Sequence, residues 1–246
     1  MPNTALITGA SSGIGWELAK YHASKGGDLI ITARREDKLN NLKAEIEKNY
    51  DVKVKIIPLD LSVQGGAAAL YKKVKATGKT IDILINNAGF GGHGFHIERE
   101  LEQEEKMIEL NVKTVVSLTH MIGNDMVKSG KGKMLHVSST AGFSPGPLQA
   151  VYFATKAFVT SFSQAIDQEF MQWLADKGIP FVIIFTKADK LGKVALNKQI
   201  EAYKSEMQKE WEELPETFVT SSENKMGTQE IADYIEKLNP HFKEVR

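Results

Sequence analysis

Cysteine is absent from the 246-residue chain, which excludes disulfides, thiolate ligands and a cysteine nucleophile. Neither sign of charge prevails, because Lys and Arg together number 31 and Asp and Glu also number 31. No net field therefore favours nucleic acid or anionic lipid. No apolar run approaches the length of a membrane-spanning helix, and the first apolar segment begins too soon after Met1 for a signal peptide. We therefore expect a cytoplasmic protein that binds neither nucleic acid nor membrane.

The composition is that of a globular protein with a sizeable core. Hydrophobic residues make up 42% of the chain and charged residues 25%, which is close to the average for soluble domains. Segments typical of strands alternate with segments typical of helices, and short connections join them. This alternation predicts a parallel sheet with crossover helices. The length suits a single α/β domain over residues 1–246.

A glycine-rich stretch, residues 8–15, stands between an apolar run and an amphipathic segment, as expected of a strand, a turn and a helix. In such a turn, Gly9 allows the bend, Gly13 lets a pyrophosphate approach, and Gly15 lets the helix pack on the strand. A flexible loop is the alternative, but the flanking segments supply the context that the motif requires. No Lys-Ser or Lys-Thr follows the glycines, so a dinucleotide is a better ligand than a triphosphate. The predicted cofactor contacts here are Gly9, Ser11, Ser12, Gly13, Ile14 and Gly15.

The end of the second predicted strand, residues 28–33, indicates which dinucleotide binds. In a dinucleotide fold, a carboxylate at this position accepts from the ribose 2′-OH, whereas an Arg accommodates a 2′-phosphate. Ala33 stands where the carboxylate would be, and Arg34 and Arg35 follow it. This pattern favours NADP(H) over NAD(H). The alternative is that the two arginines only form the solvated start of a helix.

Polar residues also follow the next two predicted strands. Residues 52–59 lead into Asp60 and Leu61, and residues 81–85 lead into Asn86-Asn-Ala-Gly89. Ligands bind at the carboxyl ends of strands in such sheets. The loop that follows contains His93 and His96, which have no companion ligands nearby, so we expect no metal site.

Tyr152 and Lys156 are four residues apart at the start of a predicted helix, which places them on one face, one turn apart. An ordinary tyrosine ionises only near pH ~10, and a neighbouring ammonium favours the phenolate. A serine at the end of the fifth predicted strand, residues 133–137, can hold a substrate oxygen beside the phenol. Alone, this pair is typical of an amphipathic helix face. Beside the glycine-rich turn and the serine it indicates acid–base chemistry that assists hydride transfer by a nicotinamide.

Residues 1 to about 166 resemble the short-chain dehydrogenase/reductase family. The resemblance rests on Thr8-Gly-x-x-x-Gly-Ile-Gly15, Asp60-Leu61, Asn86-Asn-Ala-Gly89, Asn111, Ser139 and Tyr152-x-x-x-Lys156. It implies that Tyr152 is the acid/base, that Lys156 is its partner and a ribose ligand, and that Ser139 binds the substrate oxygen. Ser139 is preferred to Ser138 because its spacing to Tyr152 suits the family.

The same resemblance assigns further residues. It implies that Asn111 holds a proton-relay water, that Asp60 lies near the adenine and that Asn87 lies near the adenosine ribose. It also implies a homodimer in which the helix over residues 101–128 and the Tyr152 helix pair with a second copy. The remaining cofactor contacts that it implies are Leu61, Ala88, Gly89, Tyr152 and Lys156.

The pattern changes after about residue 166. The Pro-Gly pair expected after the next strand is missing, and Thr186-Lys-Ala-Asp189 stands there instead. Residues from about 167 to 246 resemble the C-terminal part of a ribosome-biogenesis GTP-binding protein of the translation-factor class. That resemblance implies vestigial guanine contacts at Thr186, Lys187, Asp189, Ser221 and Ser222.

The two resemblances together predict a chimera joined inside one helix at residues 164–170, and the alternative is a natural but divergent dehydrogenase. The parts of a GTPase that handle phosphate are missing, so GTP hydrolysis is not expected. The expected fold is a doubly wound, Rossmann-like sheet of seven parallel strands in the order 3-2-1-4-5-6-7, with helices on both faces. The expected function is an engineered NADP(H) site with weak or absent dehydrogenase activity. The alternatives are an active NADP-dependent carbonyl reductase or alcohol dehydrogenase acting on a small molecule, and a non-catalytic guanine-nucleotide binder.

Overall fold

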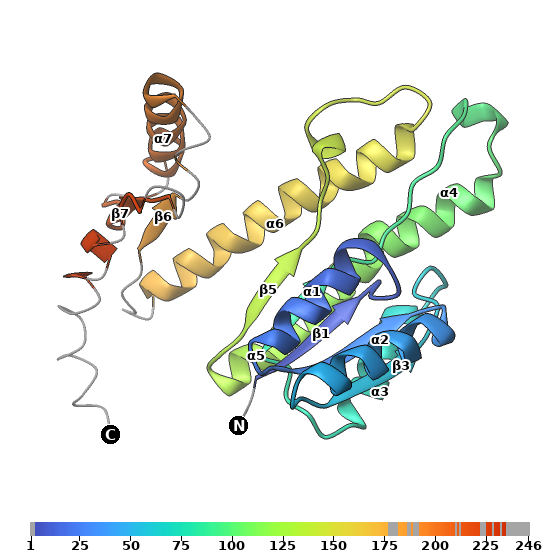
Figure 1. The fold of residues 1–246 in the computed structure, drawn as a ribbon. Helices are drawn as coiled ribbons and strands as arrows, with labels where there is room; N and C mark the ends of the chain where they lie inside the picture. The colour runs from blue at the N-terminus through green and yellow to red at the C-terminus, as the bar shows by residue number, and fades with distance from the viewer. Residues whose placement is uncertain are drawn as a thin grey trace. The chain divides into compact units, whose positions relative to one another are not determined.

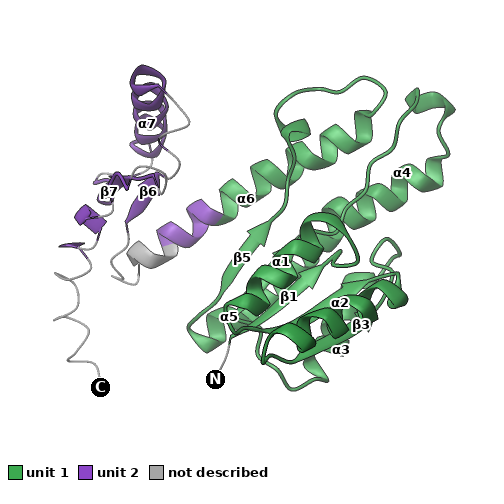
Figure 2. Ribbon diagram, viewed as in Figure 1, with its two compact units in different colours: residues 1–166 green, residues 167–246 purple. Residues whose placement is uncertain are grey.

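A computed structural model describes residues 3–176, 182–185, 188, 192–209, 211, 213–221, 225–227, 229–231, 233 and 234. Strands and helices alternate along most of this chain (Figure 1). The chain divides into two compact units, Met1–Ile166 and Asp167–Arg246 (Figure 2). Organisation as a single domain stays a prediction, as does the homodimer.

The first unit contains five strands and the helices that connect them. The strands are β1 (Thr4–Thr8), β2 (Asp28–Ala33), β3 (Val54–Pro58), β4 (Ile83–Asn86) and β5 (Lys133–His136). The helices are α1 (Gly13–Ser24), α2 (Glu36–Asn49), α3 (Gly66–Lys75), η1 (His96–Glu98), α4 (Leu101–Ile108), η2 (Glu109–Lys113), α5 (Thr114–Ser129), η3 (Thr140–Phe143) and α6 (Ala150–Asp176), which continues into the second unit.

All five strands form one parallel sheet in the order β3-β2-β1-β4-β5. β1 lies at its centre, and all five of its residues are buried. A strand buried on both faces reads as a continuous apolar run, which is typical of parallel sheets covered by helices. The Rossmann-like part of the predicted fold is therefore confirmed for these strands.

Helices cover both faces of this sheet. Side chains alternate along a strand, so Ile7 joins a cluster with Leu42 and Ile46 of α2, whereas Leu6 joins a cluster with Leu70 of α3 and Leu118 of α5. One apolar layer thus lies under α1 and α2, and the other lies under α3 and α5 (Figure 1). The sheet is therefore held between two hydrophobic layers, one on each face, and its parallel strands all end at the same edge.

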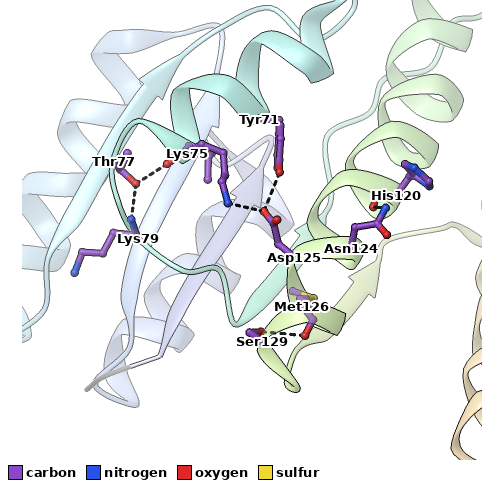
Figure 3. A network of polar contacts seen from close by, with 10 residues as sticks. Tyr71, Lys75, Thr77, Lys79, His120, Asn124, Asp125, Met126 and Ser129 are labelled. Atoms are coloured by element: carbon purple, nitrogen blue, oxygen red, sulfur yellow. Dashed lines mark hydrogen bonds and ion pairs between the residues drawn. The ribbon is translucent and has the colours of Figure 1, made fainter.

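A polar contact adds to the apolar layer between α3 and α5 (Figure 3). The Asp125 carboxylate of α5 accepts hydrogen bonds from the Tyr71 hydroxyl at 3.0 Å and the Lys75 ammonium at 3.1 Å, both on α3. The Lys75 side chain is 54% exposed and that of Asp125 26%. Solvent screens such a pair, so we assign it a modest contribution to stability.

The second unit corrects the prediction of a seven-stranded sheet. The strands β6 (Ile183–Phe185) and β7 (Thr217–Val219) pair with each other in parallel, in a separate two-stranded sheet. Each has only three residues. An apolar pattern predicts that a segment is a strand, but which strand it pairs with depends on the tertiary structure. The helix α7 (Lys193–Met207) lies between them in sequence.

Two predicted elements differ in extent from the observed ones. The long helix expected over residues 101–128 consists of α4, the π-helical segment η2 and α5. The helix α7, for which the sequence predicts a span of about residues 193–213, ends at Met207. Among the described residues, no helix has the length and apolar character needed to cross a membrane.

Candidate active site

A cleft of about 700 Å³ lies at the carboxyl ends of the five main strands, entirely within the first unit. This volume is in the range of small-molecule sites. The cleft brings together predicted residues from five separate loops. Its lining includes Gly9, Ser11, Ser12, Ile14, Arg34, Arg35, Asp60, Leu61, Asn87, Ala88, Gly89, Ser138, Tyr152 and Lys156.

The glycine-rich turn is fastened to the loop after β4. The Asn87 side-chain amide donates to the carbonyl of Thr8 at 2.9 Å and to that of Gly9 at 3.2 Å. The Thr8 hydroxyl oxygen accepts from the backbone N–H groups of Asn87 and Ala88, each at 3.0 Å. A Cβ at Gly15 would lie 2.4 Å from this amide nitrogen. The chain therefore requires glycine there, and Asn87 serves the turn itself.

The turn provides a cradle that suits a phosphate group. Gly13 begins α1 with φ +60°, and a Cβ at this position would meet no described atom within 4 Å. The backbone N–H groups at a helix N-terminus attract anions. An open turn at such a terminus fits the pyrophosphate of a dinucleotide.

The two arginines after β2 stand at one end of the cleft. The Arg35 guanidinium donates to the hydroxyls of Ser11 at 3.0 Å and Ser12 at 2.8 Å. Burial alone would raise the pKa of Asp60, but hydrogen bonds from Ser62 and the charge of Arg34 hold that pKa below its usual value. The exposed Arg35 guanidinium beside two serine hydroxyls, with Arg34 also lining the cleft, suits an anion such as a 2′-phosphate.

Asn111 fastens the loop that follows β4. It lies on η2 and is 1% exposed. Its carbonyl oxygen accepts from the Phe90 N–H at 3.1 Å, and its amide donates to the Phe90 carbonyl at 2.9 Å and the Thr155 hydroxyl at 3.0 Å. A π-helical turn often marks a functional position in a long helix. Here it carries the residue that joins this loop to α6.

Lys156 is 6% exposed, although it lines the cleft. Its ammonium donates to the Val137 carbonyl at 2.9 Å, just beyond the end of β5. Burial lowers the pKa of Lys156. A Cβ at Gly89 would lie 3.5 Å from the ammonium nitrogen, and one at Gly91 would lie 3.1 Å from the Tyr152 ring. The loop over residues 89–94 therefore lies against both members of the Tyr–Lys pair.

The two adjacent serines have different partners. The Ser138 hydroxyl donates to the Lys156 carbonyl at 2.9 Å and pairs with the Thr160 hydroxyl at 2.7 Å, so it joins β5 to α6. The Ser139 oxygen accepts from the Ala141 N–H at 3.1 Å and caps η3. Because Ser139 acts there as an acceptor, its own hydrogen remains for another oxygen. Of the two serines, Ser138 is in the cleft lining and Ser139 is not, so the role of Ser139 as a ligand of the substrate oxygen stays a prediction.

The predicted guanine contacts fall mostly outside the described residues. Of the five, only Ser221 is described, and it is buried next to β7. Thr186, Lys187, Asp189 and Ser222 lie outside the described ranges. No group of three or more His, Cys, Asp or Glu side chains able to hold a metal occurs in the part of the chain that the structure describes.

Sequence reasoning missed several polar residues around the cleft. Thr155 and Thr160 support Asn111 and Ser138, and Arg99 pairs with the buried Glu104 near the loop after β4. Glu104 stands in an acidic run that is typical of a solvated helix face. Its helical spacing could have revealed that Glu104 is buried. Glu104 lies three or four residues apart in a series of buried positions that continues with Met107, Asn111, Val115, Leu118 and Ile122.

Comparison with known proteins places this geometry in a family. Residues 3–184 match the family described as short chain dehydrogenase. The very-long-chain 3-oxoacyl-CoA reductase of Bos taurus is 32% identical over 234 residues, which cover 92% of this chain and 69% of that protein.

Two solved structures share the fold. The short-chain dehydrogenase of Sphingobium yanoikuyae, solved in complex with NADPH, is 34% identical with a TM-score of 0.65, over 76% of this chain and 70% of that one. The bulky-bulky ketone specific alcohol dehydrogenase of Comamonas testosteroni is 29% identical with a TM-score of 0.65, over 100% of this chain and 95% of that one.

These matches correct the prediction of a chimera. The family match continues to residue 184, beyond the predicted join at residues 164–170. The alignment with the bovine reductase covers 92% of the chain. Neither finding supports a GTPase-derived segment or a guanine-nucleotide binder. The short Thr186-Lys-Ala-Asp189 motif and the Ser221-Ser222 pair, on which that prediction depended, are therefore insufficient to assign a family.

Proposed function

This chain belongs to the short-chain dehydrogenase family, and we propose that it is an NADP(H)-dependent carbonyl reductase. The observation that carries the proposal is the single cleft in which the glycine-rich turn, the two arginines and the Tyr152–Lys156 pair meet. The expectation of weak or absent activity depended on a foreign segment after residue 166. Without support for that segment, an active enzyme is the better proposal.

The cofactor side of the cleft suits NADP(H). The turn over residues 9–15 would hold the pyrophosphate at the N-terminus of α1, and Arg34 and Arg35 would hold the 2′-phosphate. When bound, the reduced nicotinamide supplies the hydride. The deeper part of the cleft, where Lys156 lies, would hold the nicotinamide ribose. Solved relatives contain NADPH or NADP, which supports this assignment.

The chain's own residues would manage the proton and orient the carbonyl. The Tyr152 hydroxyl donates its proton to the carbonyl oxygen as the carbonyl carbon accepts the hydride, so the product is an alcohol. The buried Lys156 ammonium stabilises the phenolate that remains, since opposite charges interact more strongly away from water. The Ser139 hydroxyl donates to the same carbonyl oxygen and fixes its position.

Two of the loops that line the cleft also carry large exposed apolar side chains, which favour a substrate with an apolar part. The loops after β4 and β5 carry Phe95, Ile97 and Phe143, which are 63%, 92% and 76% exposed. The Gly94 N–H donates to the Leu148 carbonyl at 2.9 Å and joins these two loops. Large exposed apolar side chains on loops that also line a cleft favour ligands with apolar surface. A 3-oxoacyl thioester or a bulky ketone, the classes named for two relatives, meets this requirement.

The test is NADPH oxidation with 3-oxoacyl-CoA thioesters of increasing chain length and with aryl ketones. We expect turnover that rises with chain length. Tyr152→Phe should lower kcat by about 10²–10⁴-fold, the usual contribution of a general acid. The NADPH Kd should stay within about twofold, since the rest of the cofactor site is intact. The matched control is Tyr21→Phe, because Tyr21 is 64% exposed on α1 and does not line the cleft. Full activity of Tyr152→Phe, or NADPH binding without turnover of any carbonyl, would contradict the proposal.

A further inference from the structure

The loop over residues 89–94 forms the wall of the cleft beside the Tyr–Lys pair, and it is rich in glycine. Four of its six residues are Gly89, Gly91, Gly92 and Gly94. Glycine loses more conformational freedom on ordering than any other residue. Yet Gly91 lies against the Tyr152 ring, where a Cβ would approach to 3.1 Å. A chain this flexible needs external contacts to keep that position.

Both ends of the loop have such contacts. Near its start, Asn111 bonds both backbone groups of Phe90. At its end, the Gly94 N–H donates to the Leu148 carbonyl at 2.9 Å. The three residues between these anchors include Gly91, the residue that lies against Tyr152.

Arg99 holds this middle section. Its guanidinium donates to the His93 carbonyl at 3.0 Å. The same group covers Gly92 so closely that a Cβ there would lie 2.0 Å from its Nη2 atom, and its Cγ lies 3.6 Å from the corresponding position at Gly94. The Arg99 side chain thus bonds His93 and packs on the residue to either side, with its planar guanidinium over Gly92 and its aliphatic part beside Gly94.

Glu104 holds Arg99 in turn. The Nε of Arg99 donates to the Glu104 carboxylate, which reaches it from α4. The Glu104 side chain is 5% exposed and that of Arg99 is 21% exposed. A carboxylate is buried to this extent only where a partner compensates its lost hydration. The ion pair therefore ties the glycine-rich loop to the rigid helix that continues through Asn111.

We propose that the Arg99–Glu104 pair is a positioning device that holds residues 89–94 against Tyr152 and thereby sets the rate of turnover. Neither residue is part of the cleft lining, and we assign the pair a role that acts through the loop. Loss of the pair frees residues 91–93, between the anchors at Phe90 and Gly94, and leaves Gly89 and the rest of the cofactor site in place. Small displacements of groups around a reacting centre cost up to about a hundredfold in rate. The effect on turnover rests on the reductase function proposed above; the effect on loop order does not.

Hydrogen exchange tests the loop directly. Glu104→Leu keeps a similar volume in the buried position but removes the acceptor for Arg99, and the loss of one partner of a buried ion pair is destabilising. Exchange in the main sheet of the same sample therefore shows that the variant is folded. We expect amide exchange in peptides over residues 89–99 to speed up about tenfold, as local opening becomes easier, while peptides over residues 4–24 stay unchanged. Glu104→Gln retains an acceptor oxygen and should exchange nearly as the wild type does. The matched control is Glu102→Leu on the same helix, because Glu102 is 74% exposed and pairs only on the surface with Lys106.

Kinetics with NADPH and a carbonyl substrate give the second readout. Glu104→Leu and Arg99→Lys should lower kcat about tenfold, because a lysine offers a point charge where Arg99 bonds two partners. The NADPH Kd should change by less than about twofold, and Glu104→Gln should recover most of kcat. Unchanged loop exchange or unchanged kcat in Glu104→Leu would overturn the proposal. If the wild type reduces no carbonyl, the reductase function fails, and loop exchange alone decides whether the pair positions the loop.

Discussion

Gly15→Ala is the substitution whose cost the structure defines most sharply. Gly15 lies near the start of α1 outside the left-handed region of φ, so alanine fits the backbone there without strain. Its Cβ, however, would lie 2.4 Å from the Asn87 amide nitrogen and 2.5 Å from the Gly9 carbonyl oxygen. Neither atom moves freely, because that amide also bonds the carbonyls of Thr8 and Gly9.

The expected loss follows from two opposing effects. Overpacking of this kind costs about 1–3 kcal/mol, and replacing glycine by alanine in a helix gains up to about 1 kcal/mol. The net loss in the free energy of unfolding is then about 1–2 kcal/mol. For a chain of this size, each kcal/mol lowers Tm by about 2–4 °C. We therefore expect Gly15→Ala to melt about 2–8 °C below the wild type.

Gly13 provides a control with a different physical cause. Its φ is +60°, and a Cβ there would meet no described atom within 4 Å. Gly13→Ala should cost about 1–2 kcal/mol from backbone strain alone. Gly13→Asn should cost less, because asparagine tolerates this conformation. Asparagine at position 15 should bring no such recovery, because there the obstacle is space.

Thermal unfolding followed by circular dichroism compares the four variants without added cofactor. The reasoning is refuted if Gly15→Ala melts at or above the wild-type temperature. It is also refuted if asparagine is tolerated equally well at both positions. Either result would mean that Asn87 does not pin the turn against α1.

Other substitutions test the cofactor site, one contact between helices and one buried histidine. Arg35→Ala should weaken NADPH binding about tenfold or more and leave NADH binding nearly unchanged, since a charge-assisted hydrogen bond is worth about 1.5–3 kcal/mol; parallel calorimetric titrations check this. Asp125→Asn should lower the free energy of unfolding by about 1 kcal/mol at neutral pH, because Asp125 accepts from Tyr71 and Lys75 at a partly exposed site. Burial alone would raise the pKa of Asp125, but these donors hold that pKa below its usual range. In urea unfolding, the difference in free energy of unfolding between wild type and Asp125→Asn should therefore disappear only at acid pH, where the carboxylate is protonated. Burial lowers the pKa of His22, whose Nε2 has no hydrogen-bond partner within the described part of the chain. As the pH falls, the imidazole of His22 is therefore protonated in the unfolded chain before it is protonated in the folded chain, and the free energy of unfolding of the wild type should decline below about pH 6.5. His22→Phe should flatten that decline in the same assay.

Local patterns of the sequence were sufficient for the main sheet and for most of the cleft. Five apolar runs predict β1 to β5 near their observed bounds, because a buried parallel strand needs unbroken apolar sequence. The residues that follow those runs necessarily gather at one edge, since parallel strands all end on the same side. For this reason the sequence alone predicts that the turn after β1, the arginines after β2 and the Tyr152–Lys156 pair lie at one site.

The sequence was less informative where a residue's role depends on a distant partner. Ser138 and Ser139 are adjacent and chemically identical, and only the packing of α6 assigns the first to Thr160 and the second to η3. The strands β6 and β7 are visible as apolar runs, but their pairing with each other is not. Short motifs after residue 166 suggested a second family that the comparisons do not support.

The sequence by itself therefore determined the fold class, the position of the cleft and the preference for NADP(H), because periodicity, glycine and charge act over a few residues. Tertiary structure alone decided which polar groups are buried and which partners they meet. Glu104 illustrates the difference, because its acidic neighbours indicate a solvated face, whereas the fold buries it against Arg99 beside the glycine-rich loop. Burial of a charge is a property of the assembled chain, since the partner that compensates for lost hydration has to arrive from another element.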